Sequence, residues 1–168
     1  MQGDELRILR TAGELDSLAD EWTDLARRSP GFFCSQTFPW ARTAWDHIAA
    51  PRGRALHCLA LRSQGKLVGV WPLVVERSGS LRIVRPLGSE SSEYTAPLIE
   101  GGPDLLPRTR RLWRAAAALG DLAVMPNVRA DSALASLLSR AGWWRAPDLS
   151  APAPFLARRD YADWAAYQ

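Results

Sequence analysis

The stretch that decides the fold is Ala55-Leu-His-Cys-Leu-Ala-Leu-Arg-Ser-Gln-Gly-Lys-Leu-Val-Gly-Val-Trp-Pro-Leu-Val-Val-Glu76. It holds two apolar runs, 55–62 and 66–76, separated by a short turn that ends in Gly65. Glycine supplies the positive φ that such a turn needs. A second turn, Ser78-Gly79-Ser80, leads into a third, alternating run over 81–87. The three runs predict an antiparallel β-meander.

Pro72 interrupts the middle run of this meander. Because proline has no amide to donate, we expect a bulge or a strand edge at this position.

Helical patterns lie on both sides of the meander. A short strand over 5–11 leads into the capping box of Thr11 and Glu14, and an apolar stripe predicts one helix that ends near Ser29-Pro30-Gly31. A second helix begins at Ser35 or Thr37, with Pro39 in its first turn.

After the meander we expect a short strand over 94–99, a helix from Asp104 to Gly120, a strand over 122–128 and a helix over 132–141. This order predicts an α+β (mixed α/β) fold, with a central, mostly antiparallel sheet and helices on both faces.

The length of 168 residues suits one domain of ordinary size. Asp160 resembles a helix cap and is followed by Tyr161 and Trp164, but the sequence stops at Gln168. A typical helix runs for about eleven residues. We therefore expect a first unit over 1–157 and the start of a second, truncated unit over 158–168.

Composition excludes several classes of protein. Apolar residues make up 47% and charged residues 23%, as in an ordinary soluble domain. No apolar run approaches the roughly 20 residues of a membrane span, the N-terminus lacks the apolar core of a secretory signal, and the two cysteines are too few for a disulfide scaffold. We expect a cytoplasmic protein without a membrane span.

The usual catalytic and cofactor motifs are missing from the sequence. Cys34, His47, His57 and Cys58 lack the spacing of a metal site, and adjacent strand residues such as His57 and Cys58 point to opposite faces. There is no G-x-S-x-G, no P-loop, and no [RQ]-x-x-G-x-[GA] loop of the kind that holds the pyrophosphate of acetyl-CoA. We predict no metal site and no cofactor-binding residue within this chain.

The remaining candidates are few. Glu90, Glu93 and Tyr94 lie in a loop after a predicted strand, where a carboxylate can take a proton from an attacking amine or hydroxyl; packing of Tyr94 under the loop is an equal alternative. Trp71 is a candidate substrate wall. Arg111 belongs to a basic cluster with Arg108, Arg110 and Arg114 on one predicted helix. An exposed, solvated helix face is the best explanation of this cluster. If the cluster does bind a substrate, Arg111 is the residue we expect to contact its anionic group.

Several short motifs resemble the N-terminal half of the CelD/BcsL family, which is related to FemAB proteins and has two GNAT-like halves. They are Trp22-Thr-Asp-Leu25, Phe32-Phe33, Phe38-Pro39-Trp40, Trp45, Gly65-Lys-Leu-Val-Gly-Val-Trp-Pro-Leu73, Arg85-Pro-Leu-Gly88 and Ser92-Glu-Tyr94, with Tyr161-Ala-Asp-Trp164 resembling the start of the second half. The order and spacing of these motifs carry the resemblance along nearly the whole chain. Where the family usually has Asp-Tyr, this sequence has Glu93-Tyr94.

The resemblance implies a GNAT-like fold and the transfer of an acyl group from a CoA thioester to an amine or hydroxyl of a cell-surface polysaccharide or its precursor. It implies that Glu93 and Tyr94 are catalytic, and that acetyl-CoA is held mainly by a second half or a partner chain.

Two alternatives stay open. One is a non-catalytic module of the same fold that binds a glycan or a protein. The other is nucleic-acid binding by the Arg108–Arg114 helix, which no recognised nucleic-acid motif supports, so we expect no nucleic-acid partner.

Overall fold

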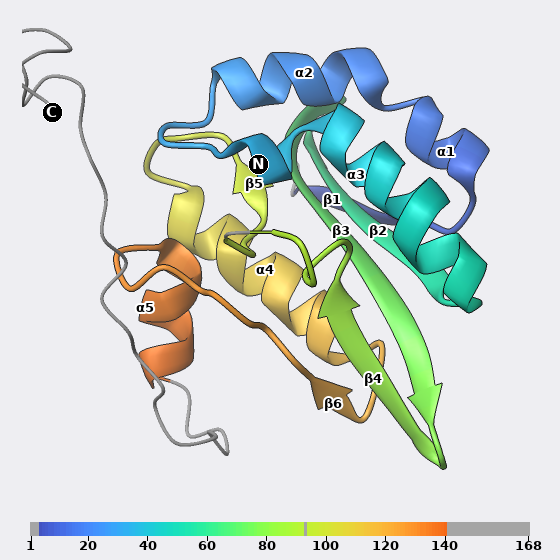
Figure 1. Ribbon diagram of the computed structural model, residues 1–168. Helices are drawn as coiled ribbons and strands as arrows, with labels where there is room; N and C mark the ends of the chain where they lie inside the picture. The colour runs from blue at the N-terminus through green and yellow to red at the C-terminus, as the bar shows by residue number, and fades with distance from the viewer. Residues whose placement is uncertain (1–3, 93, 141–168) are drawn as a thin grey trace, which may run out of the picture.

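The computed structural model describes residues 4–92 and 94–140, which form a sheet covered by helices on both faces (Figure 1). The strand order is β1-β2-β3-β4-β6, and β5 pairs with β3 beside β4. All pairs are antiparallel except β4 with β6, which are parallel. The strands are β1 Glu5–Leu9, β2 Ala55–Ser63, β3 Lys66–Ser78, β4 Leu81–Pro86, β5 Leu98–Ile99 and β6 Leu122–Ala123. The predicted α+β fold class is confirmed.

The predicted meander corresponds to β2, β3 and β4. Gln64 and Gly65 both have positive φ, 50° and 80°, in the turn between β2 and β3. The expected irregularity at Pro72 takes a different form. The bulge lies at Leu61 and Arg62, while Pro72 pairs with Cys58 of β2 and stands where the outer edge of β3 changes partner. Since that edge needs no ladder amide at this point, proline fits it.

Most of the helices predicted from the sequence are present in the structure. They are α1 Ala12–Asp16, α2 Ala19–Arg27, α3 Phe38–Ala44, α4 Leu105–Ala117 and α5 Ala133–Arg140. The Thr11–Glu14 capping box is present, and Pro39 lies in the first turn of α3. A π turn over Trp45–Ala49 and a 3-10 turn over Ala50–Arg52 extend α3 to Gly53.

The single first helix predicted from the sequence is wrong, because the segment is divided into α1 and α2 at Ser17 and Leu18. The Ser17 hydroxyl donates to the Glu14 carbonyl at 2.6 Å. This local bond competes with continued helix. Likewise, the strands expected over 94–99 and 122–128 shorten to β5 and β6.

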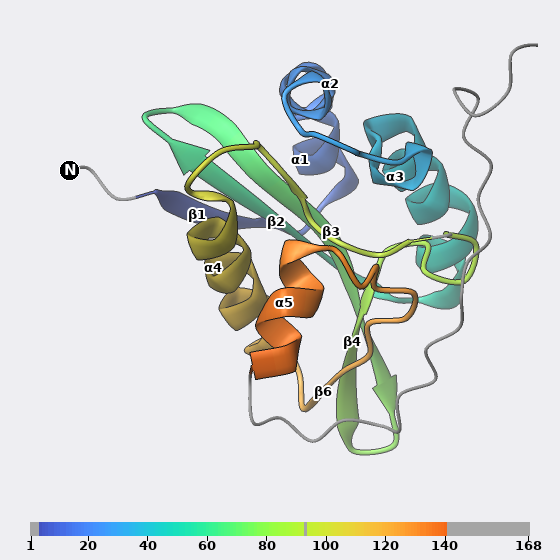
Figure 2. The same ribbon diagram turned by 90° about the vertical axis from the view of Figure 1, so that its left-hand side faces the viewer.

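Two apolar layers enclose the sheet. Helices α1, α2 and α3 cover one face and α4 and α5 the other, as Figure 2 shows edge-on. Side chains alternate along β2, so that Cys58 packs under α1–α3 and Leu59 under α4. The sequence-based expectation that His57 and Cys58 face opposite sides agrees with this alternation.

The basic cluster on α4 needs a correction. Arg110, Arg111 and Arg114 are exposed as expected, but Arg108 is only 8% exposed. Its guanidinium pairs with Asp4, Glu100 and Asp104, which is why it can be buried. Arg108 is therefore an internal ion-pair residue and not part of a solvated face.

Within the described ranges, no helix has the length and apolarity of a membrane span. The predicted cap at Asp160 and the boundary between 157 and 158 lie outside the described residues.

Candidate functional site

The candidate residues of the predicted loop lie on residues 87–97, here called the site loop. It begins where β4 leaves β3 and ends where β5 joins the same edge of β3. Val70 pairs with Leu98 of β5, whereas Leu73 pairs with Pro86 of β4. The Leu87 amide still donates to the Pro72 carbonyl at 2.9 Å. The site loop thus leaves the central sheet between β4 and β5, which pair with different parts of the same edge of β3. We call this gap between β4 and β5 the split in the sheet.

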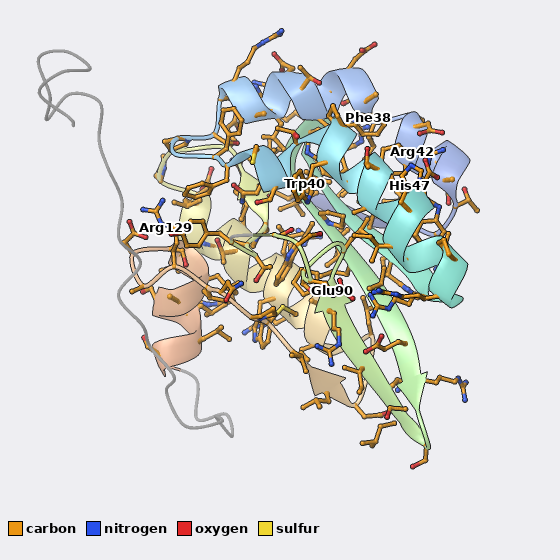
Figure 3. All side chains as sticks on the ribbon, viewed as in Figure 1. Phe38, Trp40, Arg42, His47, Glu90 and Arg129 are labelled. Carbon is orange, nitrogen blue, oxygen red and sulfur yellow. The ribbon has the colours of Figure 1, made fainter. Side chains whose placement is uncertain are left out.

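One side of the site loop is fixed against α3. Gly88 has a φ of 73°, and a Cβ placed there would lie 2.8 Å from the Ala44 Cβ. The Ser92 hydroxyl donates to the Gly88 carbonyl at 2.8 Å and accepts from Trp40 Nε1 at 3.2 Å. Figure 3 shows Trp40 beneath α3, on the side of the loop. Glycine is needed here for both conformation and space.

The other side is fixed by residues after β6 and before α3. The Thr95 hydroxyl donates to the Pro126 carbonyl, and the Thr95 amide donates to the Asn127 carbonyl at 3.3 Å. The Gln36 side chain donates to the Ala96 carbonyl at 3.0 Å and accepts from the Phe33 amide at 3.0 Å. These bonds hold the loop backbone from two directions.

Tyr94 lies at one end of the loop in an aromatic contact with Phe33. The ring centroids are 4.6 Å apart, and the Arg129 guanidinium lies 5.0 Å from the Phe33 centroid and 5.8 Å from that of Tyr94. Arg129 pairs with Asp131, which raises the pKa of Arg129. The Tyr94 ring is thus oriented by packing and a cation–π contact.

Glu90 lies at the other end of the loop, apart from Arg129 (Figure 3). Its carboxylate pairs with Arg54 and, at 3.2 Å, with Arg52. Burial favours the neutral acid, but the hydrogen bond from Arg54, a backbone hydrogen bond and the charges of Arg54 and Arg52 together outweigh it and lower the pKa of Glu90. Glu90 is therefore an ionised group that ties the loop to the start of β2, which makes it a weak proton acceptor.

Trp71 is 1% exposed, so its ring is not an open platform. It stacks obliquely on Trp113, with centroids 6.4 Å apart. A cavity of about 20 Å³ is lined by Trp71, Pro72 and Tyr94 among others. That volume holds about one water molecule.

Arg111 and Glu93 are the two remaining candidates. Arg111 is exposed on α4 and lines neither this cavity nor the larger groove described below. Glu93 lies outside the described residues, although its neighbours Ser92 and Tyr94 are both positioned.

Sequence reasoning missed the residues that hold the loop in place, Trp40, Gln36, Thr95, Asn127 and Arg129. Their contacts join positions from 31 apart, for Thr95 and Pro126, to 96 apart, for Arg129 and Phe33, which no local spacing reveals. Asn127 alone carried a signal, as the single asparagine of the sequence, and it has a positive φ of 53°.

Within the described ranges, no group of three or more His, Cys, Asp or Glu side chains can hold a metal ion. Cys58 is buried in the core, and this burial raises the pKa of its thiol, so it is not a poised nucleophile.

The acetyl-CoA implied by the family resemblance can be tested against the N-terminus of α4, the helix that follows β5. Arg108 there already pairs with Asp4, Glu100 and Asp104, and Asp104 precedes the first turn. The Leu105 amide donates to the Gly102 carbonyl. A pyrophosphate at this helix end would be repelled by the carboxylates of Glu100 and Asp104, and the Leu105 amide is already hydrogen-bonded to Gly102. The N-terminus of α4 therefore does not fit a pyrophosphate.

No protein-family model and no curated protein sequence matches the chain. Among solved structures, it is similar to a ribosomal-protein-alanine N-acetyltransferase from Brucella melitensis biovar Abortus 2308. The TM-score is 0.50 and the identity 14%, over 92% of this chain and 100% of that chain. Together with the antiparallel meander and the parallel β4–β6 pair across α4, this likeness shows that the chain has a GNAT-like fold.

Proposed function

We propose that this protein is the acceptor-side unit of a GNAT-like acyltransferase that acts on a cell-surface polysaccharide or a sugar-linked precursor. The observation that carries the proposal is the GNAT-like arrangement of meander, α4 and the parallel pair β4–β6, with a held loop at the split in the sheet. The CelD/BcsL resemblance supplies the substrate class.

In this proposal Glu93 accepts the proton of the attacking hydroxyl or amine. Its neighbours support the assignment, because Ser92 is hydrogen-bonded to Gly88 and the Tyr94 carbonyl accepts from Ser35 at 3.3 Å. These bonds anchor Ser92 and Tyr94, the two residues next to the proposed general base, and a general base acts only when it is positioned at its substrate.

The other predicted residues take supporting roles. Tyr94 donates a hydrogen bond from its hydroxyl to the acceptor. Trp71 provides a rigid wall behind the loop, and Glu90 positions the loop through Arg54. Arg111 stays a prediction as a contact for an anionic part of the substrate.

The acyl donor is placed elsewhere in this proposal. Because the N-terminus of α4 does not fit a pyrophosphate, we assign acetyl-CoA to a second half or a partner chain. We place the reaction in the cytoplasm, which the sequence favours.

The role of Glu93 is tested by acetyl transfer from acetyl-CoA in the complete gene product. Glu93→Gln should lower the rate by at least about 100-fold, the usual contribution of a general base. Glu5→Gln is the matched control, an exposed carboxylate on β1 at the edge of the sheet. A Glu93→Gln rate within about twofold of wild type contradicts the assignment.

Tyr94→Phe isolates the hydroxyl group. The ring contact with Phe33 is retained, so the unfolding midpoint should stay within about 1 °C while the transfer rate falls by about tenfold or more. An unchanged rate would leave Tyr94 with packing as its only role.

One observation favours the alternative of a non-catalytic binding module. The cavity lined by Tyr94 holds about 20 Å³, far below the roughly 300 Å³ of a small-molecule site. Acetyl transfer from acetyl-CoA to a sugar acceptor by the complete gene product tests this alternative. A rate that depends on the acceptor would reject the module.

A further inference from the structure

A second concave surface lies at the opposite end of the sheet from β5, beside the β3–β4 hairpin. Its volume is about 610 Å³, within the range of small-molecule sites. Figures 1 and 2 both show this hairpin extending past the end of α4. We call it the basic groove; it is lined by Arg52, Gly53, Arg54, Ala55, His57, Val75, Glu76, Arg77, Arg82 and Leu119.

The sheet register explains why these side chains gather. Arg77 of β3 pairs with Arg82 of β4, and Val75 pairs with Val84. Alternate residues of a strand share a face, and Val84 packs in the core under α4. Arg77 and Arg82 therefore project from the α4 face of the hairpin, where α4 has already ended.

Arg82 is held rigidly at the groove. Its amide donates to Asp121 Oδ2 at 2.8 Å, and the Asp121 amide donates to the Arg82 carbonyl at 2.8 Å. Its guanidinium contacts the same carboxylate at 3.3 Å. Gly120 lets the chain approach this closely, since a Cβ there would lie 2.6 Å from the Arg82 carbonyl oxygen.

The groove carries more positive charge than its own carboxylates neutralise. Counting the lining arginines with Arg85, five guanidinium groups contact or adjoin three carboxylates, which are Glu76, Glu90 and Asp121. Arg52 shares Glu90 with Arg54. The exposed side chain of Arg77 has no ion pair or hydrogen bond with any residue in 4–92 or 94–140. An excess of two positive charges remains.

This excess of positive charge favours an anionic ligand. A phosphate monoester carries a charge of about −1.5 to −2 at neutral pH, which matches two uncompensated guanidinium groups better than a single carboxylate does. Val75 and Leu119 supply an apolar wall, and His57 adds a ring whose Nδ1 lies 3.3 Å from the Ala55 carbonyl oxygen. Charge and apolar surface in one concavity suit a phosphorylated small molecule.

We propose that the basic groove binds a phosphorylated small molecule, with Arg77 and Arg52 as its main phosphate contacts. This inference does not rest on the proposed acyl transfer, because it concerns a different end of the sheet and is measured by binding alone.

The test is isothermal titration calorimetry of the 168-residue chain with inorganic pyrophosphate and with ADP. Both probes should bind saturably with one site. Arg77→Glu should weaken the affinity by at least about tenfold, as expected for loss of a hydrogen bond to a charged group. Arg52→Gln should weaken it in the same direction. Thermal unfolding of both variants should match wild type, since both side chains are largely exposed.

Arg110→Glu is the matched control, with the same charge change at an exposed residue of α4 outside the groove. Its affinity should stay within about twofold of wild type. Equal losses in Arg77→Glu and Arg110→Glu, or no saturable binding of either probe at millimolar concentration, would overturn the proposal. Binding of heparin without binding of pyrophosphate or ADP would overturn it too, in favour of an extended polyanion.

Discussion

At the scale of single residues, Gly88 sets the position of the site loop. Its φ of 73° lies in the left-handed region, and the space of its missing Cβ is filled by Ala44 at 2.8 Å. A side chain there has to strain the backbone and push α3 away. The loop that carries Glu90 and Tyr94 therefore depends on a residue that has no functional group.

Gly88→Ala should lower the free energy of unfolding by about 2–4 kcal/mol, because backbone strain and overpacking add. Gly79→Ala is the control, since Gly79 also has a positive φ, 61°, but nothing within 4 Å of a Cβ. It should cost only about 1 kcal/mol. Urea unfolding measures both variants, and equal losses would show that contact with Ala44 contributes nothing.

Residues of the site differ in how far the sequence could predict them. Glu90 and Tyr94 follow a strand and precede small residues, so their place in a loop was predictable. Their partners were not, because Arg54 and Phe33 reach them only through the fold. The burial of Trp71 could not be predicted from the sequence either, because its strand carries apolar side chains on both faces.

At the scale of elements, Glu100 connects three parts of the fold just after β5. Its carboxylate pairs with Arg28 after α2, with Lys66 of β3 at 3.2 Å, and with Arg108 of α4 at 3.3 Å. Burial favours its neutral form, but the hydrogen bonds from Lys66 and Arg28, together with the charges of these two residues, outweigh this and lower the pKa of Glu100.

A carboxylate whose pKa is lower in the folded chain stabilises the fold above its unfolded pKa, near 4.5, and loses this effect as the pH falls through the folded value. Glu100→Gln should therefore be less stable by about 2 kcal/mol at pH 7, because Arg108 loses a counter-ion. Below about pH 4 the difference from wild type should shrink. Urea unfolding at several pH values checks this, with Glu5→Gln as the exposed control.

A difference between wild type and Glu100→Gln that stays constant down to pH 3 would contradict this account. It would mean that the ionised carboxylate is not what connects β5 to α2 and α4.

The elements themselves were largely predictable. Strong periodicity and turn glycines identified the meander, α3, α4 and α5 because those signals are local. The break between α1 and α2 was not predictable, since Leu15, Leu18 and Trp22 keep helical spacing across it and all three are buried. Burial of Arg108 depends on Asp4 and Glu100, which come from distant segments.

At the scale of the whole molecule, the sheet divides the surface into two sites of different character. The split between β4 and β5 carries a closed loop with a cavity of about 20 Å³, and the far end of the hairpin carries an open basic groove of about 610 Å³. Sequence predicted the first region through Glu90, Glu93 and Tyr94. It missed the second, because Arg52, Arg77 and Arg82 meet only through strand register.

In the proposed reaction, residues of the site loop carry out proton transfer in an acyltransferase. The most direct measurement is the acceptor-dependent release of free CoA from acetyl-CoA by the complete gene product, compared between wild type and Glu93→Gln. We expect release in wild type that depends on a sugar acceptor and that falls by about 100-fold or more in the variant. Equal release by both proteins, or none by wild type with any sugar hydroxyl or amine acceptor, would contradict it.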